Sequence, residues 1–187
     1  MRCSWVDLID KEYIHYHDHE WGIPVHNDQK LFEMLILEGF QAGLSWQCVL
    51  HKRENFRIAF DDFDVKKVAN YDEKKEAQLI QNKGLIRHKL KIHASIKNAK
   101  SFLNIQKEFG SFNKYIWGWT KEKVILPKGS ETRSDLSDQI SKDLKKHGMS
   151  FVGTTIIYAY LCAIGIINAH EKMCDFKNKY PPFERGY

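Results

Sequence analysis

The chain has 187 residues, of which 43% are hydrophobic and 28% are charged, and its formal net charge at pH 7 is only +5. This balance is typical of a folded globular protein and excludes disordered and low-complexity chains. No apolar segment has the length and continuity of a signal peptide or a membrane span, so we expect a cytoplasmic protein that acts without a membrane.

Helical periodicity dominates the chain from its first quarter onward. In chain order, the expected helices cover residues 29–38, 45–60, 72–81, 87–108, 137–147 and 153–169. Asn27 and Ser45 supply capping side chains for the first two helices, and Gly39 is expected to end the first. Residues 120–135 are expected to form a loop, and no segment alternates as a strand does. The sequence therefore predicts an all-α protein.

The small excess of positive charge gathers in one segment. No Asp or Glu lies between Glu76 and Glu108, and this segment contains Lys83, Arg87, Lys89, Lys91, Lys97, Lys100 and Lys107. A turn at Gly84 precedes the basic helix, and such a turn is expected to leave backbone N–H groups free to attract phosphate. This placement favours contact with a nucleic-acid backbone, and a solvated basic face is the alternative.

Residues of the types that bind zinc lie at both ends of the chain. They are Cys3 and His17 near the start, and His170 and Cys174 near the end. Together they have the composition of a closed Cys2His2 structural zinc site, which would tie the two ends together. His15 and His19 are rival ligands. The alternative for each cysteine is a small buried hydrophobe, which we expect for Cys48 and Cys162. Four cysteines in such a chain do not indicate disulfides.

One acidic residue interrupts an apolar helical stripe. Leu31, Leu35 and Glu38 follow the spacing i, i+4, i+7, so Glu38 is expected to face the core unless it lies at an exposed helix end. A carboxylate in a dry pocket requires a cationic or hydrogen-bonding ligand. Trp46 lies eight residues after Glu38, and Tyr16 and Trp21 flank His17. Aromatic faces with one acid suit a stacked, positively charged heterocycle, although each aromatic alone is more often a core residue.

Eight blocks, in order along nearly the whole chain, are similar to the bacterial 3-methyladenine DNA glycosylase I family. The blocks are Cys3–Trp5, Tyr13–Gly22, Lys30–Met34, Leu37–Gly39, Gln41–Trp46, Lys52–Asn55, Gly84–His88 and Phe151–Thr155. The resemblance implies a helix-hairpin-helix glycosylase with two lobes, one formed by residues 26–109 and the other by 1–25 with 110–187. It also implies one structural zinc ion, Zn2+, bound by Cys3, His17, His170 and Cys174, which makes His15 and His19 non-ligands.

The resemblance also implies the roles of individual residues. Glu38 and Tyr16 would act in catalysis, and the base would be bound by Trp46, Trp21, Trp5, Thr154 and Thr155. The DNA would be contacted by Leu44, Gly43, Gly84, Arg87 and Lys89, with Leu44 as the candidate plug for the gap left by a flipped base. His88 stands where lyase-type relatives keep a nucleophilic lysine, which implies a monofunctional enzyme that leaves an abasic site.

The activity implied is hydrolytic excision of 3-methyladenine from alkylated double-stranded DNA in base excision repair. We expect a cytoplasmic, nucleoid-associated monomer that releases free 3-methyladenine. Two alternatives stay open, a non-catalytic zinc-containing DNA-binding module and a zinc hydrolase acting on a small molecule. Retention of Glu38, Trp46 and Tyr16 argues against the first, and a closed four-ligand zinc site argues against the second.

Overall fold

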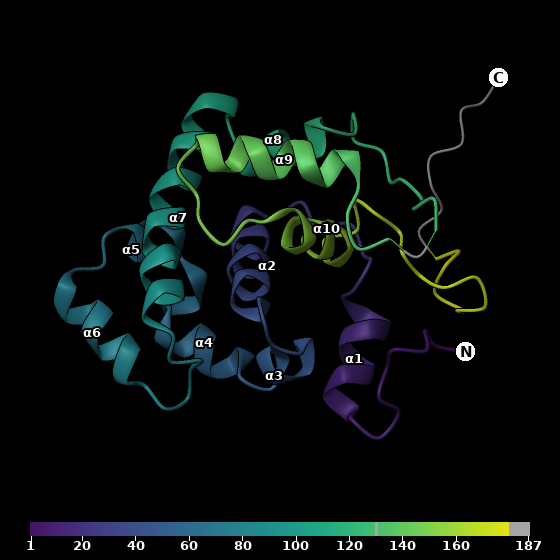
Figure 1. Ribbon diagram of the computed structural model, residues 1–187, viewed down its shortest axis with the longest axis horizontal. Coiled ribbons are helices and arrows are strands. Elements are labelled where there is room, and N and C mark those ends of the chain that lie inside the picture. The colour runs from purple at the N-terminus through teal and green to yellow at the C-terminus, as the bar shows by residue number, and fades with distance from the viewer. Residues whose placement is uncertain (130, 180–187) are drawn as a thin grey trace.

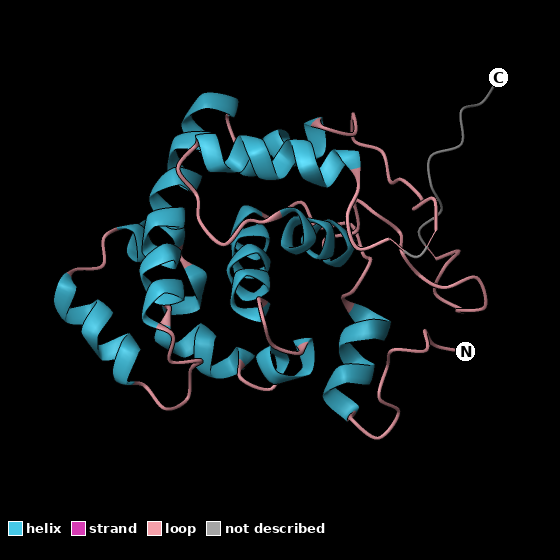
Figure 2. Ribbon diagram, viewed as in Figure 1, coloured by secondary structure: helices cyan, strands magenta, loops and turns pink. Residues whose placement is uncertain are grey.

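The computed structural model describes residues 1–129 and 131–179 and is built mainly of helices joined by loops (Figures 1 and 2). The α-helices are α1 (Lys11–His19), α2 (Asp28–Gln41), α3 (Trp46–Leu50), α4 (Arg53–Ala59), α5 (Val65–Ala69), α6 (Glu73–Gln81), α7 (Lys89–Phe109), α8 (Phe112–Gly118), α9 (Asp135–Lys146) and α10 (Thr154–Ala163). A short turn, η1 (Asp61–Phe63), joins α4 to α5. Over the described ranges the only β-type pairing is an isolated bridge between Ile125 and Ile167, so the all-α prediction is confirmed.

Helix α2 lies at the centre of the molecule and is surrounded by α3, α7, α8 and α10 (Figure 1). Its middle residues, from Leu31 to Phe40, are all buried. Helix α10 packs against both α2 and α9, and its aliphatic and aromatic side chains extend the same core. The C-terminal half of α2 therefore projects its side chains into the interior, next to α10. None of the described helices is both long and apolar enough to cross a membrane.

The predicted helix starts agree closely with the structure. The side chain of Asn27 accepts a hydrogen bond from the backbone N–H of Lys30, and Ser45 and Asp72 cap α3 and α6 in the same way. The predicted helix over 45–60 is divided into α3 and α4 at the turn containing His51. Capping side chains thus predicted helix starts well, because the hydrogen bond that they make is local.

Two helix ends differ from the prediction. Helix α2 continues past Gly39 to Gln41, and Phe40 is buried in the core. The last buried helix ends at Ala163 rather than at residue 169. There Gly165 adopts φ +79°, and a Cβ atom on it would lie 2.5 Å from the backbone carbon of Ile23. This close approach turns the chain out of the helix and into the bridge with residue 125.

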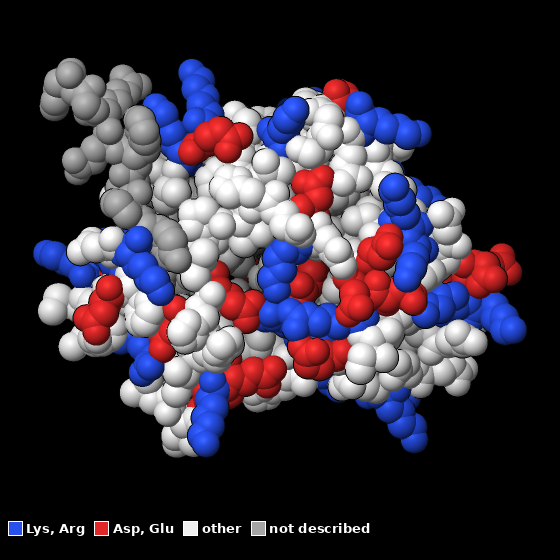
Figure 3. All heavy atoms as spheres, turned by 180° about the vertical axis from the view of Figure 1, so that it is seen from behind, with Lys and Arg blue, Asp and Glu red and all other residues white. Residues whose placement is uncertain are grey.

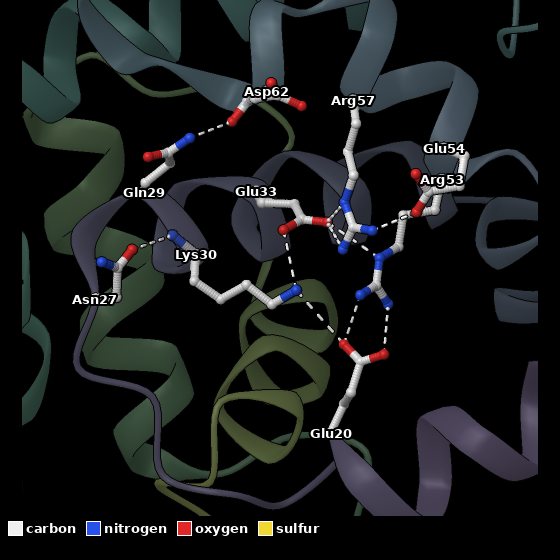
Figure 4. A network of polar contacts seen from close by, with 9 residues as sticks. All are labelled: Glu20, Asn27, Gln29, Lys30, Glu33, Arg53, Glu54, Arg57 and Asp62. Carbon is white, nitrogen blue, oxygen red and sulfur yellow. Dashed lines mark hydrogen bonds and ion pairs between the residues drawn. The ribbon is translucent and has the colours of Figure 1, made fainter.

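Helix α1 was not predicted, and a partly buried ionic network fixes its C-terminal end (Figure 4). Glu20, directly after α1, accepts two hydrogen bonds from the Arg53 guanidinium, at 3.1 and 2.6 Å. Arg53 Nε also lies 3.1 Å from Glu33 Oε1, and Lys30 Nζ lies 3.0 Å from Glu33 Oε2. Three separate helical segments are thereby joined by charges of both signs. On the face of the molecule drawn in Figure 3, positive and negative side chains are interleaved.

Candidate functional site

A cavity of about 360 Å³, here called the aromatic pocket, opens between α1, the C-terminal half of α2 and α10. Its lining comprises Trp5, Tyr13, Tyr16, Trp21, Glu38, Gln41, Trp46, Glu131, Thr132, Thr155, Tyr158, Ala159, Cys162 and Ala169. These residues come from both of the predicted lobes, although the lobe boundaries themselves stay a prediction. The volume is in the lower part of the range for small-molecule pockets.

Glu38 is the polar centre of the aromatic pocket. Its side chain is 3% exposed, and its Oε2 atom has no hydrogen-bond partner. Burial raises the pKa of the Glu38 carboxyl to about 8. The exposed-helix-end alternative is therefore wrong, since the residue faces the interior of the pocket. An unpaired carboxyl in so dry a place is costly, and a cationic ligand would offset that cost.

Six of the residues that line the pocket are aromatic. The ring centroids of Tyr16 and Trp46 lie 5.1 Å apart, and Trp5 lies 5.3 Å from Tyr13 and 4.9 Å from Trp21. Trp46 is buried, and its indole N–H has no partner. Burial holds the pKa of the Tyr16 phenol well above its usual range, so its hydroxyl stays protonated. These faces suit a flat heterocycle, with hydrogen-bond donors and the Glu38 carboxyl at its edge.

The two threonines of the Phe151–Thr155 block have different surroundings. Thr155 lines the aromatic pocket as predicted. The side chain of Thr154 instead lies 2.9 Å from the Ser137 hydroxyl and donates to Asp138 on α9. The prediction that Thr154 lies in the base pocket is therefore wrong. Neighbours on a helix are separated by about 100°, so only one of them faces the pocket.

Several pocket residues were not predicted. Tyr13 is one helical turn from Tyr16, Gln41 is one turn from Glu38, and Tyr158 is one turn from Thr155. Helical spacing from a known pocket residue would have found these three. Cys162 is buried as predicted and also lines the aromatic pocket. Glu131 lies in the loop between α8 and α9, where no local pattern indicates which side chains turn inward.

The structure brings together three of the four predicted metal ligands. Ligand atoms of Cys3, His17 and Cys174 all lie within 4.8 Å of one another, and all three side chains are buried. His17 Nδ1 lies 2.8 Å from Asp18 Oδ1, which fixes the ring and leaves Nε2 directed toward Cys174 Sγ, 3.5 Å away. A carboxylate that orients a histidine in this way is typical of metal sites.

His170, the fourth predicted ligand, lies beside this cluster. Its ring centroid is 5.3 Å from that of His17, and its buried Nε2 atom has no hydrogen-bond partner. Gly22 has φ +75°, and a Cβ atom there would lie 2.6 Å from His170 Cε1. Only glycine leaves room for this ring, and the unpartnered Nε2 is a donor for an ion. The donor set thus fits a metal of the kind that cysteine and histidine bind.

Of the remaining predictions for histidine and cysteine residues, one agrees with the structure and one does not. His15 and His19 are exposed on α1, with their rings 4.7 Å apart, and they lie outside the ligand cluster. Cys48 is exposed, so the prediction that it is a small buried hydrophobe is wrong. It lies on the outer side of the five-residue helix α3, whose buried face consists of Trp46, Val49 and Leu50.

The predicted turn at Gly84 is present, with α6 on one side and α7 on the other. Arg87 and Lys89 are exposed at the start of α7. The Gly84 N–H donates to Asn82 Oδ1 at 2.8 Å, so the expectation that this amide is free is wrong. In the segment between α2 and α3, Gly43 is exposed and Leu44 keeps 42% of its surface exposed.

Lys91 does not lie on the surface with the other basic residues of its segment, so the segment is not one charged surface. Its side chain is buried, and its Nζ atom donates to the backbone oxygens of Phe40 at 2.8 Å and Ala42 at 2.6 Å. These carbonyls end α2 and have no partners within that helix. Lys91 therefore anchors the segment that carries Gly43 and Leu44 to the start of the basic helix.

Comparison with known proteins gives consistent results. The model of the family described as methyladenine glycosylase matches residues 5–178. DNA-3-methyladenine glycosylase 1 of Escherichia coli is 44% identical over 178 residues, covering 92% of this chain and 95% of that protein. DNA-3-methyladenine glycosylase of Haemophilus influenzae is 42% identical over 181 residues, covering 94% and 97%. A variant of 3-methyladenine DNA glycosylase I, solved in complex with 3-methyladenine, is 34% identical with a TM-score of 0.91, covering 96% of this chain and 99% of that one.

Proposed function

The chain belongs to the methyladenine glycosylase family, and from this premise we propose how its aromatic pocket performs the reaction. The protein is a DNA-3-methyladenine glycosylase, a repair hydrolase that excises 3-methyladenine from DNA. The observation that carries the mechanism is the buried and unpaired carboxyl of Glu38. Membership of the family establishes the activity, and the roles of individual residues are our proposal.

The damaged nucleotide rotates out of the duplex, and its base enters the aromatic pocket. Methylation at N3 leaves the base with a positive charge while it is still attached to the sugar. Trp46 and Tyr16 pack against the ring of the base, and the positive charge of the base favours the ionised form of Glu38. Glu38 then accepts hydrogen bonds from the adenine edge, and its proton passes to solvent. A neutral adenine provides no charge to offset the cost of ionising Glu38, so it binds less well.

The bond that breaks is the N-glycosidic bond. Its electron pair passes to the base, which leaves as neutral 3-methyladenine, and the sugar becomes oxocarbenium-like. Water attacks C1′ and releases one proton to solvent, which leaves an abasic site. Because the leaving base is already cationic, it needs no proton from an acid, unlike the leaving group in ordinary glycoside hydrolysis. Trp21, Trp5 and Thr155 complete the enclosure that holds the base.

The turn at Gly84 with the start of α7 acts as the helix-hairpin-helix grip on the DNA backbone. Exposed Arg87 and Lys89 supply charge for phosphate contacts, and exposed Leu44, next to Gly43, fills the gap in the duplex. No lysine stands at position 88; His88 caps α7 through its Nδ1 atom. The enzyme is therefore monofunctional and forms no covalent adduct with the sugar. It works as a monomer in the bacterial cytoplasm, where its DNA substrate lies.

Zinc would be bound by Cys3, His17 and Cys174, with His170 as the fourth ligand. This proposal is supported by the converging donor atoms and by the unpartnered Nε2 of His170. Four protein ligands leave no open position for a water or a substrate, so the metal would be structural. It would join the segment before α1 to the segment after α10, both of which line the aromatic pocket.

Release of free 3-methyladenine from methylated duplex DNA tests the proposed function. We expect Glu38→Gln to lower kcat/KM by about 10- to 100-fold, the usual effect of losing one charged hydrogen bond. Glu12→Gln, an exposed acid on α1, should leave the rate unchanged. Equal rates for wild type and Glu38→Gln would exclude the proposed role. Failure of the wild type to release any base would favour the alternative, a non-catalytic DNA-binding module that contains zinc.

A further inference from the structure

A second carboxylate, that of Glu131, lines the aromatic pocket. It lies outside every sequence block that resembles the family, in the loop between α8 and α9. This loop is anchored on both sides of Glu131. The Ile125 N–H donates to the Ile166 carbonyl at 2.9 Å, and the Ser134 hydroxyl accepts from the Ser137 N–H at 3.2 Å. The loop is thus held at residue 125, six positions before Glu131, and at residue 134, three positions after it.

The Glu131 carboxylate has no cationic partner among the described residues. The nearest arginine in its own loop, Arg133, is paired with Asp138 at 2.9 Å. Glu131 is half-buried, and it lines both the aromatic pocket and the neighbouring cavity that contains Lys128 and Arg133. The charge influences the pocket wall. Burial, with contributions from Cys162 and Glu131, raises the pKa of Tyr158 to about 12.

Glu131 and Glu38 differ in how much water surrounds them. Glu38 is fully enclosed, and burial favours its neutral form in the empty pocket. Glu131 keeps contact with solvent, so a carboxylate there costs far less. Of the two carboxylic acids that line the pocket, Glu131 is therefore the one in contact with solvent. Attraction to its carboxylate acts on a cation and leaves a neutral base unaffected.

Resting on the proposed function, we propose that Glu131 is a second specificity-determining residue, whose carboxylate favours entry of cationic alkylated purines over neutral bases. Glu38 then recognises the base at the inner end of the pocket, and Glu131 selects for charge at the loop side. The two carboxylates act on one positive charge from different elements of the fold. No covalent step is assigned to Glu131.

The test compares Glu131→Gln with Glu122→Gln, which changes an exposed acid of the same loop that lies outside the pocket. One substrate is a duplex containing 3-methyladenine, which is cationic. The other is the same duplex containing the uncharged isostere in which carbon replaces N3, for which binding is measured. We expect Glu131→Gln to lower kcat/KM for the cationic base by about five- to tenfold and to leave binding of the neutral isostere within about twofold. Glu122→Gln should change neither quantity.

Each other outcome overturns the proposal. Unchanged excision by Glu131→Gln means that its charge does not reach the substrate. Equal losses on the cationic and the neutral duplex mean that Glu131 only holds the loop in place. Failure of wild type and Glu122→Gln to excise 3-methyladenine would instead reject the proposed function, so the two failures are distinguishable. Thermal unfolding of both variants verifies that the fold is retained.

Discussion

The aromatic pocket and the Cys3–His17–Cys174 cluster both have buried polar atoms with no hydrogen-bond partner at or beside them. In the pocket these atoms are Glu38 Oε2 and Trp46 Nε1, and beside the cluster it is His170 Nε2. The donor atoms of the cluster converge within 4.8 Å, a distance suited to one ion. The polar groups of the pocket instead surround about 360 Å³, a space suited to a flat organic base.

This difference separates a permanent ligand from a transient one. Unsatisfied buried groups destabilise a fold, and the cost is tolerated where a ligand offsets it. At the cluster the ligand would remain bound and contribute to stability. In the pocket the cost is retained in the empty enzyme, and under the proposed function the cationic base relieves it. The same physical feature thus fits the proposed structural site at one place and the proposed catalytic site at the other.

Loss of the proposed zinc ion should have the largest effect. We expect Cys174→Ser, or removal of zinc by a chelator, to lower the melting temperature by roughly 10 °C or more, because structural zinc contributes on the order of 10 kcal/mol in small domains. Differential scanning calorimetry with metal analysis measures both quantities. His15→Ala, an exposed histidine outside the cluster, is the matched control and should keep its zinc. Purified wild type without zinc, or Cys174→Ser with an unchanged melting temperature, would contradict the comparison.

Lys91 is the contrasting case, a buried charge with its partners present. Lys91→Met removes two hydrogen bonds to the end of α2, and we expect a loss of about 1.5–3 kcal/mol in the free energy of unfolding. Lys97→Met, at an exposed position of the same helix, should change it by less than about 0.5 kcal/mol. Urea denaturation measures both variants. If Lys91→Met lowered the free energy of unfolding no more than Lys97→Met does, the carbonyls at the end of α2 would need no partner.

Local chemistry explains how much of the fold the sequence predicts. Helix starts capped by Asn27, Ser45 and Asp72 depend on hydrogen bonds within four residues, and they agree with the structure. The end of α10 depends on the distant residue Ile23, which the pattern around Gly165 does not reveal. Helix α1 was not predicted because its buried residues are largely polar and have partners elsewhere in the chain, so it has no apolar periodicity.

The site residues also fall into those that local patterns predict and those that depend on distant segments. The position of Glu38 in an apolar stripe predicts its burial, because helical spacing is a local property. The burial of Lys91 depends on carbonyls about fifty residues away, so a count of charges places it wrongly on the surface. Glu131 lies in a loop with no periodicity, and only the folded chain brings it to the pocket. Local patterns predict single residues well, whereas pairings between distant segments require the structure.

The pH dependence of kcat/KM for excision of 3-methyladenine tests the central claim. This claim is that the empty pocket contains an unpaired carboxyl, which a cationic base pairs with on binding. In the free enzyme the pKa of Glu38 is raised to about 8, and the ionised form is the one that meets the cation. As the pH rises, kcat/KM should increase by about tenfold per unit below this value and level off above it. Glu38→Gln should be slower and should lose this rise. A flat profile for the wild type, or the same rise in Glu38→Gln, would contradict the account.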